Sequence, residues 1–306
     1  MIADETWRII GETQQGASHV FLGTPNQDDI DWDKEDDPFP WAVIAVADGH
    51  GSPKCFRSKR GASLAVDIAV KVGREFLMSQ IKEPNRPLVK SLAEEKLPRL
   101  ILDRWLQEVE RDCVRQPFSA EELSALDSRE NQVARKAVEE RPALAYGTTL
   151  ITCLFTTGFV IYLQIGDGDI LSVSSEGEVS RPFPADPRLF ANETTSLSSK
   201  DALRDFRFGF QVISGRPPAL TLLSTDGYSN AFRDNDGFLK VGSDLLDIIR
   251  TDGPGQVEQY LPTWLNEATE TGSGDDVTLG LVIWEEVVAR VPRGTAEGDV
   301  DRAHHE

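Results

Sequence analysis

Short apolar runs and long amphipathic stretches divide this chain into recognisable segments. Residues 41–47 are uniformly apolar and predict a buried strand, and residues 7–11 and 18–22 predict two shorter strands joined by a turn at 14–16. Residues 24–40 are polar and acidic, which predicts a loop ahead of the buried strand.

Two long helices are predicted next. In residues 61–80 and again in residues 97–114, apolar side chains recur at every fourth position, and Pro84 and Pro87 predict a break between the two segments. This spacing favours a helix face packed on a core over a partner-binding surface. Residues 115–143 are charged and favour a surface excursion or a third helix.

The second half of the chain is richer in strand-forming residues. Strands are predicted at 148–156, 159–165, 170–174, 219–224 and 277–284. Two further helices are predicted at 241–250 and 257–266, whereas residues 183–218 predict no regular element, which is typical of a functional or mobile segment. Strands at both ends bracket the helices, which predicts one α+β domain with two long helices packed on a largely antiparallel sheet system.

Composition narrows the classes of partner. The 306 residues carry 32 basic and 51 acidic side chains, so the net charge is 32 − 51 = −19, which argues against nucleic acid or an anionic membrane as a partner. Cys55, Cys113 and Cys153 form no CxxC pair, and neither a signal peptide nor a membrane-length apolar run is evident. We therefore expect a cytoplasmic protein, with a charged, disordered tail at 291–306.

Four acidic motifs share one local design, an Asp beside a Gly at the end of a predicted strand. They are Asp48-Gly49, Gly166-Asp167-Gly168-Asp169, Thr225-Asp226-Gly227 and Gly274-Asp275-Asp276. Each motif alone is typical of a turn. If the four strand ends converge, their oxygens form a pocket for hard divalent cations, and His50 beside it could act as an acid catalyst in phosphoryl chemistry.

The order of these motifs resembles that of the metal-dependent (type 2C) serine/threonine protein phosphatases, over about residues 16–285. The resemblance rests on Asp48-Gly49-His50-Gly51, Tyr146-Gly147-Thr148-Thr149, Ile165-Gly166-Asp167, Ser224-Thr225-Asp226-Gly227 and Asp275-Asp276-Val277-Thr278. Asn26-Gln27-Asp28 resembles the family's early Asn-Glu-Asp motif. His19 and the Gln27-Asp28 pair are most similar to a bacterial subgroup of the family.

The resemblance implies a fold and a division of roles. The fold is a central antiparallel β-sandwich flanked by pairs of helices, forming a single catalytic domain over residues 1–290 with a variable flap-like segment at 183–218. Asp48 would bridge two Mn²⁺ or Mg²⁺ ions and the Gly49 carbonyl would ligate one of them. Asp226 and Asp275 would hold the other ion.

Further roles follow from the same resemblance. Asp28 would lie next to the two ions, acting directly or through water. A hydroxide shared by the ions would attack the phosphorus of a phosphoserine or phosphothreonine, and His50 would protonate the departing oxygen. The partners implied are a phosphorylated protein substrate and a cognate Ser/Thr kinase.

Three positions depart from the family pattern. Gln27 replaces a Glu and cannot carry charge, and Asn230 replaces an Asp that would help to hold a third, weaker ion. Either Asp167 holds that ion alone or the third site is absent. The usual phosphate-binding Arg is missing near Gly23, so His19, Arg57 or Arg60 would have to bind phosphate.

These departures keep other functions open. A catalytically weak or inactive relative would use the fold for binding or signalling, and hydrolysis of a small phosphorylated metabolite is a third alternative. Metal-dependent turnover separates the first two hypotheses. Comparing a phosphoprotein with a metabolite separates the third.

Overall fold

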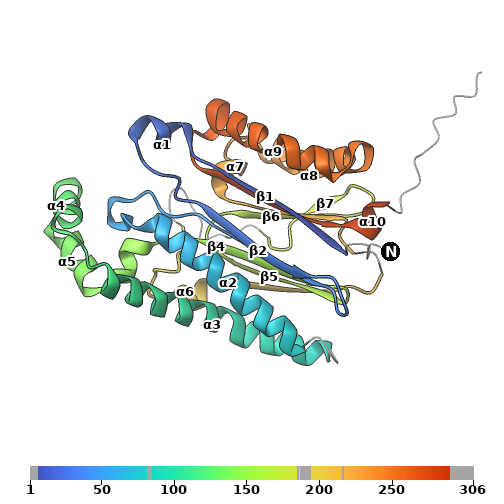
Figure 1. Cartoon of the computed structure of the whole chain (residues 1–306), viewed down its shortest axis with the longest axis horizontal. Helices are drawn as coiled ribbons and strands as arrows, with labels where there is room; N and C mark the ends of the chain where they lie inside the picture. Colours follow the sequence, from blue (N-terminus) through green and yellow to red (C-terminus); the bar gives the residue numbers. More distant parts are fainter. Residues whose placement is uncertain (1–5, 81–84, 185, 187–193, 216, 290–306) are drawn as a thin grey trace, which may run out of the picture.

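The computed structural model describes residues 6–80, 85–184, 186, 194–215 and 217–289. Two five-stranded antiparallel sheets lie face to face, and a pair of long helices covers the outer face of each (Figure 1). The predicted α+β sandwich with flanking helix pairs is confirmed. The predicted tail at 291–306 lies outside the described residues.

The strand order places both chain halves in each layer. The first sheet runs β1-β10-β9-β6-β7, made of Trp7–Gln14, Val277–Trp284, Leu220–Ser224, Asp169–Val173 and Val179–Ser180. The second runs β2-β3-β4-β5-β8, made of Asp29–Glu35, Trp41–Ala47, Leu150–Thr156, Phe159–Ile165 and Arg207–Val212. Sequence-distant strands therefore lie side by side, as β1 and β10 do along their whole length.

The long helices cover the two sheets in pairs. Helices α2 (Ser58–Gln80) and α3 (Arg86–Arg115) pack on the second sheet, and α8 (Asn235–Asp252) and α9 (Pro254–Ala268) pack on the first. The shorter helices are α1 (Ala17–Leu22), α4 (Ala120–Arg129), α5 (Gln132–Glu140), α6 (Ala202–Asp205), α7 (Asp226–Ser229) and α10 (Glu285–Ala289). Within the described ranges, no helix combines the length and the apolar character that a membrane crossing requires.

Strand β3 shows why the most apolar run of the sequence becomes a central strand. Val43 and Ala45 pack in the core beneath α2 and α3, while Ala42 and Ile44 pack between the two sheets. Both faces of the strand are buried, so alternation between polar and apolar residues disappears. The prediction at 41–47 is confirmed residue for residue.

The predicted strand at 18–22 is wrong, because this segment forms helix α1. Its apolar side chains are exposed, Phe21 by 89%. The helix is fixed by its neighbours: the Ala17 amide donates to the Thr269 hydroxyl, and Ser18 donates through its amide and its hydroxyl to the Gly274 carbonyl. These contacts come from residues over 250 positions away, which a local pattern does not reveal.

The predicted loop at 24–40 contains strand β2, and this prediction is also wrong in part. Ile30 and Trp32 alternate with aspartates and lie over Gly11, where a Cβ atom would come within 2.6 Å of the Trp32 ring. The aspartates, which have low strand propensity, hid the alternation. Similarly, segment 183–218 contains β8 and α6, with residues 185, 187–193 and 216 outside the described part.

Helix α3 begins eleven residues before the predicted start, at Arg86. Pro87 occupies its first turn, where a proline is tolerated because that amide has no partner within the helix. Asn85 caps the helix, accepting a hydrogen bond from the Leu88 amide. The proline predicted to break a helix therefore helps to start one.

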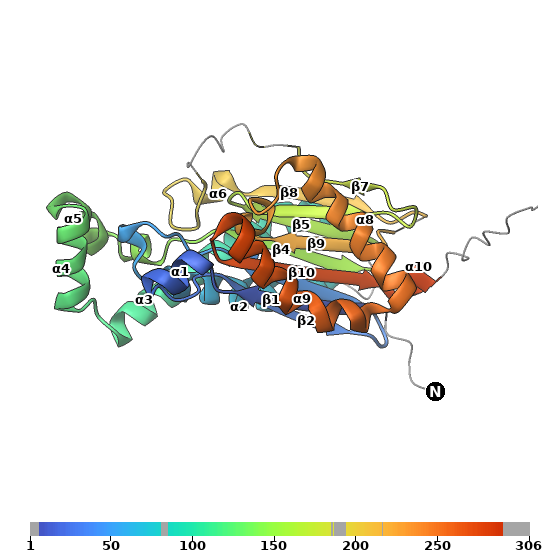
Figure 2. The same ribbon diagram turned by 90° about the horizontal axis from the view of Figure 1, so that it is seen from above.

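One end of the sandwich carries the acidic motifs. The end of β1 pairs with the start of β10, the start of β2 with the end of β3, and the start of β6 with the end of β9. Helices α1, α4 and α5 extend beyond this end (Figures 1 and 2). Asp28, Asp48, Asp226 and Asp275 flank these strand ends and are therefore brought to one side of the molecule.

Candidate metal centre

Three aspartates converge at this end of the sandwich and are called the Asp48 cluster below. Asp48 follows β3, Asp167 follows β5 and Asp226 follows β9. One carboxylate oxygen from each lies within 4.8 Å of the others. The turns after three strands of two different sheets thus place three carboxylates around one point.

The backbone around Asp48 is held by β4 and its preceding turn. The Asp48 amide donates to the Thr149 hydroxyl at 3.0 Å, and the Asp48 carbonyl accepts from the Thr149 amide and the Thr148 hydroxyl, both at 2.8 Å. A side chain at Gly49 would come within 2.6 Å of the Gln27 carbonyl oxygen. Glycine is therefore needed for this close approach of strand end, early loop and α2.

The negative charges of the Asp48 cluster repel one another. Burial raises the pKa of Asp48 well above its usual range, and the neighbouring charges of Asp28, Asp226 and Asp167 raise it further. Burial and the charge of Asp167 raise the pKa of Asp226 to about 6, although a hydrogen bond with Asp48 lowers it. Within the described residues, no lysine or arginine pairs with the three carboxylates.

This donor set fits divalent cations. Clustered carboxylate oxygens are the ligands that Mg²⁺ and Mn²⁺ prefer. Burial first and then the charges of neighbouring aspartates raise the pKa of Asp48 and Asp226, so a bound cation would favour their ionised forms. Asn230 donates from Nδ2 to Asp226 Oδ2 at 3.0 Å, so the residue that departs from the family pattern orients a carboxylate of the cluster.

Asp28 lies beside the cluster and is buried. Its Oδ2 accepts hydrogen bonds from the Thr225 hydroxyl at 2.7 Å and the Thr278 hydroxyl at 2.8 Å. Burial raises the pKa of Asp28, these hydrogen bonds lower it, and the charges of Asp276 and Asp275 raise it. Two threonines to which the sequence analysis gave no role therefore hold this carboxylate, although both stand within the quoted motifs.

A second group, called the His19 cluster, contains His19, Asp275 and Asp276. His19 Nδ1 lies 2.9 Å from Asp276 Oδ2, and His19 Nε2 lies 3.6 Å from Asp275 Oδ1. Asp276 is buried and accepts from the backbone amides of Gly16 at 2.7 Å and Gln27 at 2.6 Å. This carboxylate ties α1 and the early loop to the start of β10, a role that the sequence analysis missed.

The two clusters divide the predicted site residues. Asp48, Asp167 and Asp226 lie together, whereas Asp275 lies against His19, with its side chain 53% exposed. Its charge still raises the pKa of Asp226, so it is electrostatically linked to the Asp48 cluster. His19, predicted to bind phosphate, faces two carboxylates in this structure.

His50 follows the Asp48 cluster directly. Its amide donates to the Gly147 carbonyl at 3.1 Å, and a side chain on Gly147 would come within 2.8 Å of the imidazole. Burial lowers the pKa of His50, and the charge of Asp167 acts in the opposite direction. The imidazole is thus fixed next to the carboxylates by a glycine turn.

The two arginines considered for phosphate binding have protein partners. Arg57 donates to Glu122 and to the Tyr146 hydroxyl, at 2.8 to 2.9 Å, and its guanidinium lies over the Phe118 ring. Arg60 donates to Asp112 at 3.2 Å. Arg57 thus connects the turn before α2 to α4, and Arg60 connects α2 to α3.

A recess of about 360 Å³ opens beside Asp167. Gly168, Arg181 and Arg207 are among the residues that line it. Arg181 donates to Asp169 at 2.6 Å and to the Asn235 side chain at 2.7 Å, which fixes its guanidinium at the rim. The Asp48 cluster therefore adjoins a space that contains positively charged groups.

Comparison with known proteins gives a consistent result. The model of the family described as "Protein phosphatase 2C" matches residues 15–266. No curated protein sequence matches the chain.

Several solved structures share the fold at low sequence identity. A bacterial serine phosphatase is 14% identical, with a TM-score of 0.56, over 90% of this chain and 97% of that one. The phosphatase Stp1 from Staphylococcus aureus is also 14% identical, with a TM-score of 0.55, over 92% and 97%. The catalytic domain of the serine/threonine phosphatase PstP, solved with two manganese ions, is 17% identical, with a TM-score of 0.51, over 90% and 97%.

Proposed function

This chain belongs to the protein phosphatase 2C family, and we propose that it hydrolyses phosphoserine and phosphothreonine in proteins with two Mn²⁺ or Mg²⁺ ions as cofactors. The observation that carries the proposal is the convergence of Asp48, Asp167 and Asp226, with which no lysine or arginine of the described residues pairs. The manganese complex of PstP, whose fold this chain shares, supports the choice of metal.

The residues proposed to hold the two ions are Asp48, the Gly49 carbonyl, Asp226 and Asp275, with Asp28 beside them. Asp167 is proposed to hold a third, weaker ion. When bound, the cations lower the pKa of a water molecule and neutralise charge on the phosphoryl oxygens. The hydroxyls of Thr225 and Thr278 both donate to Oδ2 of Asp28 and so hold its carboxylate in place.

The remaining chemistry belongs to the chain's own groups. His50 is proposed to hold a proton for the departing serine or threonine oxygen. Because burial lowers the pKa of His50, this role requires a pH on the acidic side of the ordinary histidine range. The recess beside Asp167 is proposed to receive the residues around the phosphate. Replacing His50 by Ala should lower kcat for a phosphoserine peptide by about 10²-fold or more. The loss should be smaller for p-nitrophenyl phosphate, whose leaving group needs no acid, and equal losses would contradict the role.

The proposal is tested by a metal-titrated phosphatase assay. The purified protein should hydrolyse p-nitrophenyl phosphate and a phosphopeptide with Mn²⁺, and lose this activity in EDTA or with Asp48→Asn. Activity that survives either treatment would overturn the metal assignment. Binding of Mn²⁺ without turnover would instead favour the alternative of a signalling relative.

Three broader expectations complete the proposal. Residues 1–290 act as one catalytic domain, a cognate Ser/Thr kinase phosphorylates the substrate, and the protein works in the cytoplasm. The sparse, unpaired cysteines support the reducing compartment. Faster turnover of a small phosphorylated metabolite than of any phosphoprotein would contradict the protein substrate.

A further inference from the structure

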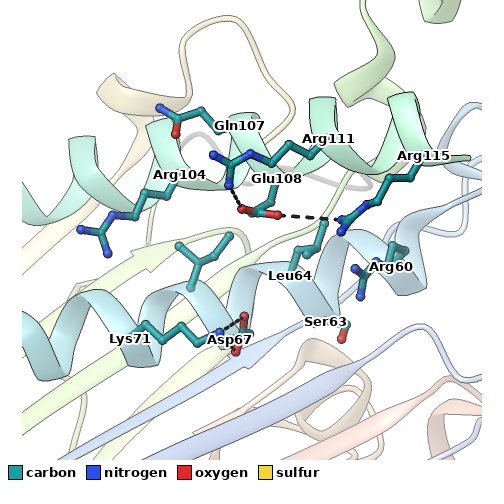
Figure 3. Close-up of a pocket in the computed structure, with 11 residues that line it drawn as sticks. Arg60, Ser63, Leu64, Asp67, Lys71, Arg104, Gln107, Glu108, Arg111 and Arg115 are labelled. Atoms are coloured by element: carbon teal, nitrogen blue, oxygen red, sulfur yellow. Dashed lines mark hydrogen bonds and ion pairs between the residues drawn. The ribbon is translucent and has the colours of Figure 1, made fainter.

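A groove of about 630 Å³ runs between α2 and α3, away from the Asp48 cluster. Figure 3 shows that its labelled side chains come from both helices, with Arg104, Arg111 and Arg115 on α3 and Arg60 and Lys71 on α2. Leu64 and Ile68 also line it, and both are largely buried. The groove is therefore closed beneath by buried apolar side chains and lined by cationic groups from both helices.

The charge of this groove is opposite to that of the whole protein. Of its lining residues, five are arginine or lysine and two, Asp67 and Glu108, are acidic. The chain as a whole carries 51 acidic and 32 basic side chains. These cations also pair with carboxylates of the two helices, Asp67, Glu75, Glu108 and Asp112. The groove therefore attracts an anion through a small excess of cations and through the remaining donors of the exposed arginines.

The arginines of α3 retain capacity for a ligand. Arg111 pairs with Glu108, and Arg104 pairs with Glu75 at 2.7 Å, but their side chains are 65% and 40% exposed. The contacts of Arg115 to Glu108 and Asp112 are long, at 4.0 and 3.9 Å. Exposed ion pairs of this kind contribute little, and a guanidinium has five donors, so an incoming carboxylate can bind beside or in place of the internal one.

The groove begins near the end of the sandwich that carries the Asp48 cluster. Arg60 lies two residues after Ser58, whose hydroxyl accepts a hydrogen bond from the Gln27 side chain next to Asp28. From there the groove follows α2 toward Lys71 (Figure 3). An extended chain leaving the Asp48 cluster could continue into it.

We propose that the α2–α3 groove binds an acidic segment of the phosphoprotein substrate, at a distance from the phosphorylated residue. The proposal rests on the proposed function. The cationic side chains that line the groove pair with the carboxylates of the segment. The groove then selects among substrates, while the Asp48 cluster performs the hydrolysis.

The test compares two double variants on three substrates. The first double variant, called the groove variant, combines Arg104→Gln with Arg111→Gln and removes two cations of the groove. Arg8→Gln with Lys240→Gln is the matched control, because Arg8 and Lys240 also pair with exposed carboxylates, Glu258 and Asp244, but lie outside the groove. The substrates are p-nitrophenyl phosphate, a phosphoserine peptide with an acidic extension, and the same peptide with a Gly-Ser extension.

We expect the groove variant to raise KM for the acidic peptide about five- to tenfold, as two surface ion pairs would contribute. Its kcat, and its kinetics on the other two substrates, should match those of the unaltered protein. An unchanged KM for the acidic peptide would overturn the proposal. An equal rise in the control variant would also overturn it, because net charge alone would then explain the effect.

A binding measurement separates this proposal from the proposed function. Fluorescence anisotropy with an acidic peptide that lacks phosphoserine, in EDTA, reports on the groove without catalysis. If the protein shows no phosphatase activity but binds the acidic peptide, and the Arg104→Gln, Arg111→Gln variant binds it more weakly, the proposed function is overturned. The groove then remains a binding site for acidic peptides. If the protein hydrolyses phosphopeptides but the loss of Arg104 and Arg111 does not change its affinity for the acidic peptide, only the proposal about the groove is overturned.

Discussion

The Asp48 cluster and the His19 cluster contain similar residues in opposite electrostatic situations. In the His19 cluster, Asp276 receives two backbone amides and lies 2.9 Å from an imidazole. In the Asp48 cluster, the charges of neighbouring carboxylates help to raise the pKa of Asp48 and Asp226. In the first arrangement the protein supplies backbone donors to the buried carboxylate, whereas the second is proposed to take up cations from outside.

This difference assigns different tasks to residues that a sequence motif cannot separate. Adjacent residues Asp275 and Asp276 both belong to the His19 cluster, but Asp276 is buried and Asp275 is half exposed. We infer that Asp276 stabilises the fold, and that Asp275 is available to the Asp48 cluster. Four predictions test the comparison.

The largest effect is expected for Asp226→Asn. Removal of this proposed metal ligand should lower kcat by about 10²-fold or more, because bound cations would stabilise charge in the transition state. In EDTA near neutral pH, the same variant should raise the free energy of unfolding by roughly 1–3 kcal/mol, since it removes a charge that the folded state disfavours.

Kinetics with p-nitrophenyl phosphate and urea unfolding in EDTA measure the two effects. Asp226→Glu is the matched control, since it keeps the charge and should bring no gain in stability. A stability loss in Asp226→Asn would show that the cluster is internally compensated, which contradicts the comparison.

Asp276→Asn should behave in the opposite way. One of the two amides that Asp276 accepts from, Gly16 or Gln27, would lose its acceptor, at a cost of about 1–3 kcal/mol in the free energy of unfolding. Mn²⁺ affinity should change less than in Asp226→Asn. If Asp276→Asn abolishes Mn²⁺ binding and leaves the free energy of unfolding unchanged, the His19 cluster is the metal site, which contradicts the comparison.

A smaller effect is expected for Thr225→Val. Asp28 would lose one of its two hydroxyl donors, and a positioning contact of this kind is worth about tenfold or more in metal affinity. Thr221→Val is the matched control on β9, the strand that Thr225 follows, because the buried Thr221 hydroxyl has no hydrogen-bond partner in the described part of the chain. Calorimetric titration should show weaker Mn²⁺ binding by Thr225→Val than by Thr221→Val. Equal Mn²⁺ affinities of the two variants would show that Thr225 does not position Asp28 for metal binding.

The smallest effect is the pH dependence of the metal-free protein. The pKa of Asp226 is about 6 in the folded state, against an ordinary 3.8, so the folded state binds its proton more tightly. The contribution of Asp226 to the free energy of unfolding should therefore fall as pH rises from about 4 to about 6, by on the order of 1 kcal/mol. Urea unfolding in EDTA across this range should show a flatter profile for Asp226→Asn than for the unaltered protein, and identical profiles would contradict the raised pKa.

Much of the fold could be predicted because its central strands are apolar on both faces. Strands β3, β5 and β10 match their predicted ranges in residues 41–47, 159–165 and 277–284. Strand β2 could not be recognised at the edge of its sheet, since its alternating polar residues are aspartates on the side of α2, where Asp33 pairs with Arg74, while Ile30 and Trp32 lie over Gly11 of the other sheet. Helix α1 was mistaken for a strand because its conformation depends on Thr269 and Gly274.

The candidate site, like the fold, could be predicted only in part. The Asp-Gly motifs at strand ends gave Asp48, Asp167 and Asp226, which the structure brings together. The role of Asp276 depends on backbone amides at positions 16 and 27, so no spacing in the sequence could indicate it. The position of His19 between two carboxylates likewise arises only when α1 meets the start of β10.

Anomalous diffraction at the manganese edge, from crystals grown with Mn²⁺, tests the central claim most directly. The account predicts two manganese peaks, both within bonding distance of Asp48, with Asp226 and Asp275 around one of them. The space between His19 and Asp276 should show no peak. A manganese ion bound by His19 and Asp276, with none at Asp48, would contradict the account.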